Sequence, residues 1–79
     1  MFISDRTLYQ TIGKNIKFYR EENGLTQAQL SERAALSLSY ISKIEADNCH
    51  KSFSISALNQ IANALNTEIT AFFREDPQT

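Results

Sequence analysis

The sequence predicts an all-α protein that folds as a compact bundle of five helices. Two glycines and one proline leave few residues suited to hairpin turns, and good helix formers dominate the composition. Apolar residues recur at helical spacing, and polar residues that cap helices stand before most of these runs. The length of 79 residues suits one domain. We therefore predict a single domain over residues 1–79, with an N-terminal arm (1–6) and a C-terminal tail (75–79).

The first helix is predicted over about residues 7–22. Its apolar face consists of residues spaced by four, four and three positions, Leu8, Ile12, Ile16 and Tyr19. This spacing places them on one side of an α-helix. Gly13 lies beside Ile12, where it lets another helix approach closely, and Asn23-Gly24 supplies a stop signal.

The next two helices are short and closely connected. Thr26 and Gln29 match a capping box, which predicts a helix over about residues 27–34. Ser37 is the expected N-cap of the third helix, in which Ile41 and Ile44 face inward. That assignment leaves four residues on the outward side: Leu38, Ser39, Ser42 and Lys43. Two short helices joined by so few residues must cross steeply, as in a helix-turn-helix unit.

The second half of the chain contributes a polar loop and two further helices. Residues 46–53 form the loop, and Ser54 is the expected cap of a fourth helix that begins at about Ile55. A final short helix is predicted over about residues 68–74. It carries the apolar residues Ile69, Phe72 and Phe73.

The run GLTQAQLSERAALSLSYISKIE resembles the helix-turn-helix of the Cro/Xre-type phage-repressor family. The resemblance extends from about Leu8 to Phe73 and implies a helix-turn-helix DNA-binding domain. Tyr40-Ile41-Ser42 and the aromatic last helix are similar to controller proteins of restriction-modification systems, and short phage or plasmid repressors are the alternative. Two residues depart from the family pattern. Ala35 stands where glycine is usual, and Leu38 stands where a polar base-reading residue is frequent.

The resemblance implies roles for individual residues on DNA. Base reading falls to the outward residues of the third helix, Leu38, Ser39, Ser42 and Lys43. Leu38 either packs on a thymine methyl group or reads nothing. Phosphate contacts fall to Gln27, Tyr40, His50 and Lys51. For Tyr40, covering the core is the alternative.

Two further sets of residues have structural roles in the family. Arg20 and Glu45 stand where the family has an ion pair, and two exposed charges are the alternative. The dimer interface implied by the resemblance consists of Ile69 and Phe72, with Phe73 turned more inward. The alternative is that all three side chains close the core of the monomer.

Charge and composition limit the other function classes. The net charge of −1 gives no global signal for a polyanion partner, so DNA binding must rest on local cations. Cys49 and His50 lack further ligands at zinc-site spacing, so we expect no metal and no cofactor. No apolar run reaches the roughly 20 residues of a membrane span, and we expect a cytoplasmic protein that does not bind membranes. His50 has no serine or carboxylate partner at a recognisable spacing, and the chain has no phosphate-binding glycine loop, so we expect no enzyme.

The resulting prediction is a dimeric, sequence-specific DNA-binding regulator of transcription. It would bind a palindromic operator through the major groove, because one short helix contacts too few base pairs for useful specificity. The alternative is an antitoxin-like interaction module that uses its apolar C-terminal face.

Overall fold

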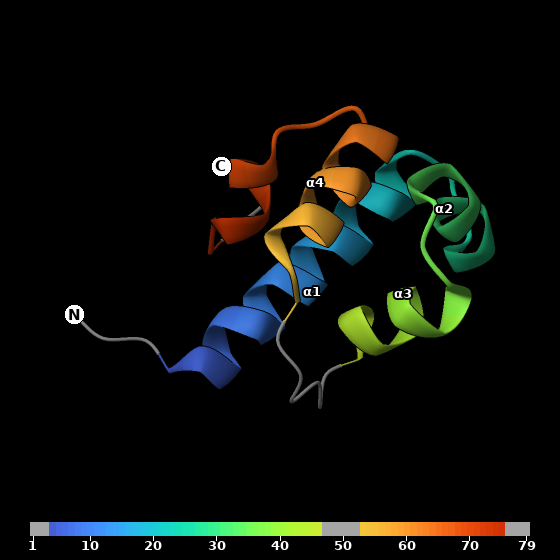
Figure 1. Cartoon of the computed structure of the whole chain (residues 1–79). Coiled ribbons are helices and arrows are strands. Elements are labelled where there is room, and N and C mark those ends of the chain that lie inside the picture. The colour runs from blue at the N-terminus through green and yellow to red at the C-terminus, as the bar shows by residue number, and fades with distance from the viewer. Residues whose placement is uncertain (1–3, 47–52, 76–79) are drawn as a thin grey trace.

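The first helix, α1 (Asp5–Glu22), is the support against which α3 and η1 pack. The computed structural model describes residues 4–46 and 53–75. Over these ranges the chain has four α-helices and one 3-10 helix. After α1 come α2 (Gln27–Ala34), α3 (Leu38–Glu45), α4 (Ile55–Ala64) and η1 (Ile69–Phe73). Figure 1 shows α3 and η1 well separated, with α1 and α4 between them.

The N-terminal arm is shorter than predicted, because α1 begins at Asp5 rather than near Thr7. Ser4 is the N-cap, and its hydroxyl oxygen accepts a hydrogen bond from the backbone N–H of Thr7 at 3.1 Å. Asp5 adds a negative charge in the first turn, where it complements the helix dipole. Residues 4–6 therefore belong to the cap and first turn of α1, and the predicted arm was wrong for them.

Capping residues begin the other α-helices where the sequence predicted. The Thr26 hydroxyl accepts from the N–H of Gln29 at 3.0 Å, and the Gln29 amide oxygen accepts from the N–H of Thr26 at 2.8 Å. Ser37 caps α3 and Ser54 caps α4 through the same type of bond. Ala35, between α2 and α3, adopts the left-handed conformation with φ of 57°. The turn thus has the backbone that glycine usually supplies, at a cost of about 1–2 kcal/mol for alanine.

The hydrophobic core draws on α1, α2, α3, α4 and η1 together. Of the inward positions predicted in the first and third helices, Ile12, Ile16, Ile41 and Ile44 are buried, whereas Leu8 and Tyr19 are partly buried against the cluster. The buried members are Ile12, Ile16, Leu25, Leu30, Ala34, Ile41, Ile44, Leu58, Ile61, Ala62, Leu65 and Phe72. The α2–α3 unit is therefore joined to the bundle by its own apolar face, which leaves the opposite face of α3 exposed.

The last element is a 3-10 helix of five residues, η1, rather than the α-helix predicted over residues 68–74. Glu68 provides no side-chain cap, and Arg74 already has extended backbone. The side-chain amide of Asn15 in α1 donates to the backbone oxygens of Phe72 at 2.8 Å and Arg74 at 2.6 Å. These bonds fasten the end of η1 to α1. The predicted bundle of five helices is thus four α-helices and a 3-10 turn.

The orientation expected for the two adjacent phenylalanines was wrong. Phe72, expected at a dimer interface, has none of its surface exposed, and it packs against Tyr19 with ring centroids 6.1 Å apart. Phe73, expected to face inward, is 45% exposed, and Ile69 is partly buried. In a 3-10 helix residues three apart share a face, so Ile69 and Phe72 lie on the same side and Phe73 is turned about 120° away from them.

At Gly13 the backbone of α3 approaches α1 closely. A Cβ atom at this position would collide with the backbone oxygen of Ile44. The sequence predicted that a helix would approach here, and the structure confirms it. The absence of a side chain at Gly13 allows α3 to pack directly against α1.

We predict that Gly13→Ala destabilises the fold by about 1–3 kcal/mol, because the obstacle is backbone that must shift. The intrinsic preference of a helix interior would instead favour alanine by about 1 kcal/mol. Urea titration monitored by circular dichroism measures the change. Gly24→Ala is the comparison: its φ of 67° strains alanine, but nothing lies within 4 Å of the added atom. A Gly13→Ala protein as stable as the wild type would contradict the close contact.

Candidate nucleic-acid interface

The exposed face of α3 carries four side chains that the sequence assigned to base reading. Ile41 and Ile44 are buried against the bundle, so the residues on the opposite side of the helix project outward. Leu38 is 47% exposed, and the polar members of the face are also exposed. The complete face is Leu38, Ser39, Ser42 and Lys43. Lys43 lies in the last turn, where a cation also complements the helix dipole.

An ion pair between Arg20 and Glu45 joins α1 to the end of α3. The Arg20 Nε donates to Oε2 of Glu45 at 2.7 Å, and Nη2 donates to Oε1 at 2.9 Å. The guanidinium also donates through Nη1 to the backbone oxygen of Leu25 at 2.7 Å. The two side chains are only 10% and 2% exposed. The pair is therefore bidentate and buried, the alternative of two exposed charges is excluded, and the pair sets the angle at which α3 leaves the bundle.

The hydrogen bond to Glu45 raises the pKa of Arg20 above its ordinary value, with burial acting in the opposite direction. A folded-state pKa above the unfolded one favours the charged form in the folded protein. The stabilisation is therefore complete below the unfolded-state pKa and is lost only as the pH rises through the higher, folded-state pKa. Both lie in the strongly alkaline range, so titration of Arg20 leaves the pair intact at neutral pH.

Gln27 extends this pair into a network that reaches the exposed face of α3. Its amide Nε2 donates to Oε1 of Glu45 at 3.0 Å, and its Oε1 accepts from the hydroxyl of Ser42 at 2.9 Å. The sequence assigned Gln27 to a phosphate. Its side chain is also hydrogen-bonded to Glu45 and Ser42, and the amide nitrogen has a second hydrogen that can bind another acceptor.

The other residues assigned to phosphates divide into two groups. Tyr40 is partly buried and packs against the core cluster, so its ring contributes to the fold while part of it reaches solvent. His50 and Lys51 lie outside the described residues. Their role on DNA stays a prediction from the sequence.

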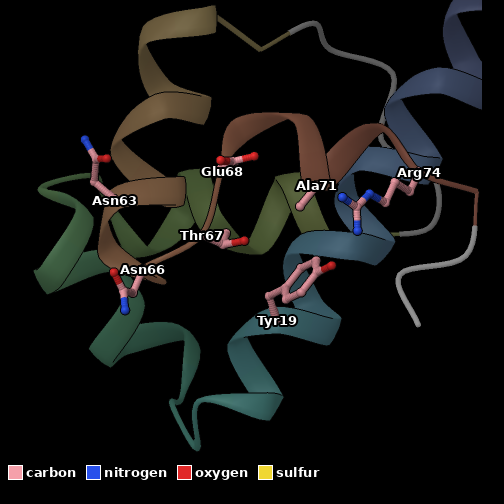
Figure 2. Close-up of a pocket in the computed structure, with 7 residues that line it drawn as sticks. All are labelled: Tyr19, Asn63, Asn66, Thr67, Glu68, Ala71 and Arg74. Carbon is pink, nitrogen blue, oxygen red and sulfur yellow. The ribbon is translucent and has the colours of Figure 1, made fainter. Parts of the chain in front are cut away.

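A pocket of about 470 Å³ lies away from these residues, between the end of α4, α1 and η1. Figure 2 shows Tyr19 reaching it from α1 and Arg74 from the segment after η1. The full lining is Tyr19, Asn63, Asn66, Thr67, Glu68, Ala71 and Arg74. None of these residues belongs to the predicted DNA-contacting set. The pocket and the α3 face are therefore separate features.

Residues 4–46 and 53–75 contain neither a candidate metal site nor a candidate membrane-spanning helix. No group of three or more histidine, cysteine, aspartate or glutamate side chains there has an arrangement that suits a metal ion. Within the same ranges, no helix combines the length and the apolar character that crossing a membrane requires.

Sequence reasoning missed two structural contacts, the bonds of Asn15 to the end of η1 and the inward hydrogen bonds of Gln27. Asn15 lies between Ile12 and Ile16 on the buried side of α1, and a polar residue there was a usable signal for a buried hydrogen bond. The inward role of Gln27 had no local signal, because Glu45 is 18 positions away and Ser42 is 15 positions away in the chain.

We predict that Arg20→Met and Glu45→Gln each destabilise the protein by about 3–5 kcal/mol, because each leaves a buried polar partner uncompensated. The double variant should be destabilised by clearly less than the sum of the two single effects. Denaturant titration of all three variants gives the coupling energy. Lys17→Met in α1 is the matched control, because Lys17 is exposed and its loss should change stability by less than about 0.5 kcal/mol. Additive single effects would contradict an energetically coupled pair.

Comparisons with known proteins show which sequences and folds this chain resembles. Residues 13–75 match the helix-turn-helix domain family. The immunity repressor protein of Bacillus phage phi105 is 42% identical over 66 residues, which cover 84% of this chain and 44% of the phage protein. This chain thus spans less than half the length of that relative, whose name is that of a repressor and not of an enzyme.

Two solved structures have closely similar folds. The restriction-modification controller protein C.AhdI from Aeromonas hydrophila superposes with a TM-score of 0.75 at 25% identity, over 82% of this chain and 96% of that one. SinR, the master regulator for biofilm formation, was solved in complex with DNA. It superposes with a TM-score of 0.74 at 33% identity, over 80% of this chain and 98% of that one. The sequence match and these folds establish that the chain belongs to the Cro/C1-type helix-turn-helix family.

Proposed function

We propose that this chain is a sequence-specific, DNA-binding regulator of transcription that acts as a dimer on a palindromic operator. The observation that carries the proposal is the α3 face, on which exposed short polar groups and one cation stand on a helix held by a buried ion pair. A rigidly held helix with hydrogen-bonding side chains suits the edges of base pairs in the major groove. The solved DNA complex of SinR, a related fold, supports the same use.

On the exposed face of α3, the cation and the hydroxyl groups contact different base groups in this proposal. Lys43 matches the O6 and N7 acceptors of guanine, and serine hydroxyls serve several bases. Ser39 and Lys43 are four positions apart, so they project from one side of the helix. Leu38 offers an apolar surface that suits a thymine methyl group.

Phosphate contacts come from the flanks of α3 in this proposal. Gln27 has a free amide hydrogen for a phosphate oxygen while its other groups stay in the protein network. The backbone N–H groups and the positive end of the helix dipole both lie at the start of α2, and both favour a phosphate there. Tyr40, His50 and Lys51 complete the set that the sequence assigned.

Dimerisation follows from the size of the reading element. α3 has eight residues and spans about 12 Å, so one copy meets only a few base pairs. Two-fold symmetry places two copies in successive major grooves, about 34 Å apart. Exposed Phe73 and partly buried Ile69 form the apolar contact that we propose, without Phe72. The burial of Phe72 also reduces the apolar face on which the antitoxin-like alternative depended.

Selection of bound sites from a random DNA pool should yield a palindrome, and Lys43→Ala should weaken binding to it by about 1–3 kcal/mol. The loss should relax preference at one position in each half-site, because Lys43 discriminates between bases. Lys51→Ala is the comparison, expected to weaken cognate and scrambled duplexes alike and to reduce the salt slope by about one unit per protomer. Affinity measured on both duplexes at several salt concentrations separates the two effects. Equal losses for Lys43→Ala on both duplexes would make it a phosphate contact.

We predict that Phe73→Ala weakens the dimer without unfolding the protomer, because the ring is largely exposed in the single chain. Phe72→Ala should instead destabilise the fold by about 3–5 kcal/mol through loss of a buried ring. Sedimentation equilibrium measures the dimer, and thermal unfolding followed by circular dichroism measures the fold. A Phe73→Ala protein that dimerises like the wild type would move the interface elsewhere.

A further inference from the structure

The hydroxyl group of Ser42 has a defined direction, although it lies on an exposed helix face. Its oxygen is 2.9 Å from Oε1 of Gln27. An amide oxygen carries no hydrogen, so the hydrogen between the two oxygen atoms belongs to Ser42. The single proton of this hydroxyl is therefore directed into the protein.

The orientation of the Gln27 amide follows from the buried ion pair. The Glu45 carboxylate, paired with the guanidinium of Arg20, can only accept hydrogen bonds. The end of the Gln27 amide that lies 3.0 Å from Glu45 must then be its nitrogen. The amide oxygen is left facing Ser42. Ser42 therefore donates to Gln27, Gln27 donates to Glu45, and Arg20 donates to the same carboxylate from the other side.

We propose that Ser42 is a specificity-determining residue that reads bases only as a hydrogen-bond acceptor. The inference rests on the proposed function of α3 as the base-reading helix. Because its hydrogen is engaged in the hydrogen bond to Gln27, the hydroxyl presents only lone pairs to the groove. In the major groove the donors are the N6 amino group of adenine and the N4 amino group of cytosine. Ser42 thus selects an exocyclic amino group, and Gln27 is the positioning residue that imposes this choice.

Ser39 provides an internal contrast on the same helix. It is also exposed, and within residues 4–46 and 53–75 its hydroxyl has no hydrogen-bond partner. Its proton can therefore turn toward an acceptor or away from it. Two serines three positions apart on one face then differ in what they recognise: Ser39 serves both kinds of group, and Ser42 serves donors only.

The test uses base analogues in the duplex that the wild-type protein selects from a random pool. One series replaces the amino group of adenine or cytosine by hydrogen at each position of a half-site, and a second series replaces purine N7 by carbon. At one position, loss of the amino group should weaken wild-type binding about three- to tenfold, as expected for one neutral hydrogen bond. Ser42→Ala should be insensitive to the same replacement, and loss of N7 should have no effect that depends on Ser42.

Gln27→Met tests the positioning role directly. It releases the Ser42 hydroxyl, so discrimination among the four base pairs at that one position should shrink. Discrimination at the position that Ser39→Ala identifies should stay as in the wild type, which separates repositioning from general damage to the fold. Any loss of a phosphate contact would instead lower affinity for all duplexes alike.

Three results would overturn this inference. They are a Ser42-dependent loss that arises from N7 replacement, no Ser42-dependent loss in either series, and full wild-type discrimination in Gln27→Met. A wild-type protein that binds selected and scrambled duplexes equally would instead overturn the proposed function itself. The two failures are thus distinguishable.

Discussion

The buried ion pair between Arg20 and Glu45 is the interaction on which the geometry of the exposed α3 face depends. α3 has only eight residues, so its own backbone hydrogen bonds give it little independent stability. Its position comes from Ile41 and Ile44 in the core and from the carboxylate at its last residue, held in two bonds by α1. A bidentate pair fixes direction as well as distance, which apolar packing alone does not.

The first helix serves both ends of the molecule through two small polar or side-chain-free positions. At Gly13 it admits the backbone of α3, and at Asn15 it binds the carbonyl groups at the end of η1. The elements that carry the proposed reading face and the proposed dimer contact are thus both held by α1. Because the two half-sites of a palindrome have a fixed spacing, a common support for both surfaces is what a dimeric reader requires.

The low charge of α3 has a physical explanation in this arrangement. A helix held by a buried pair needs no cations of its own to stay in place on DNA, provided that neighbouring groups contact the phosphates. The Ser42 hydroxyl then gains from being directed, since an acceptor of fixed orientation discriminates between bases better than a hydroxyl that rotates freely. The network from Arg20 through Glu45 and Gln27 to Ser42 supplies that direction within the protein.

Local chemistry by itself determined the α-helices, their caps and the apolar core, because spacing and capping act within a few residues, as at Thr26, Ser37 and Ile41. The resemblance to known repressors added the pairing of Arg20 with Glu45, which no local pattern encodes. Only the tertiary structure decided the rest. The 3-10 winding of η1, fastened to α1 by Asn15, left Phe72 buried and Phe73 exposed. The donor order at Ser42 was equally hidden, because it arises from groups far apart in the chain that meet only when α2 and α3 pack on α1.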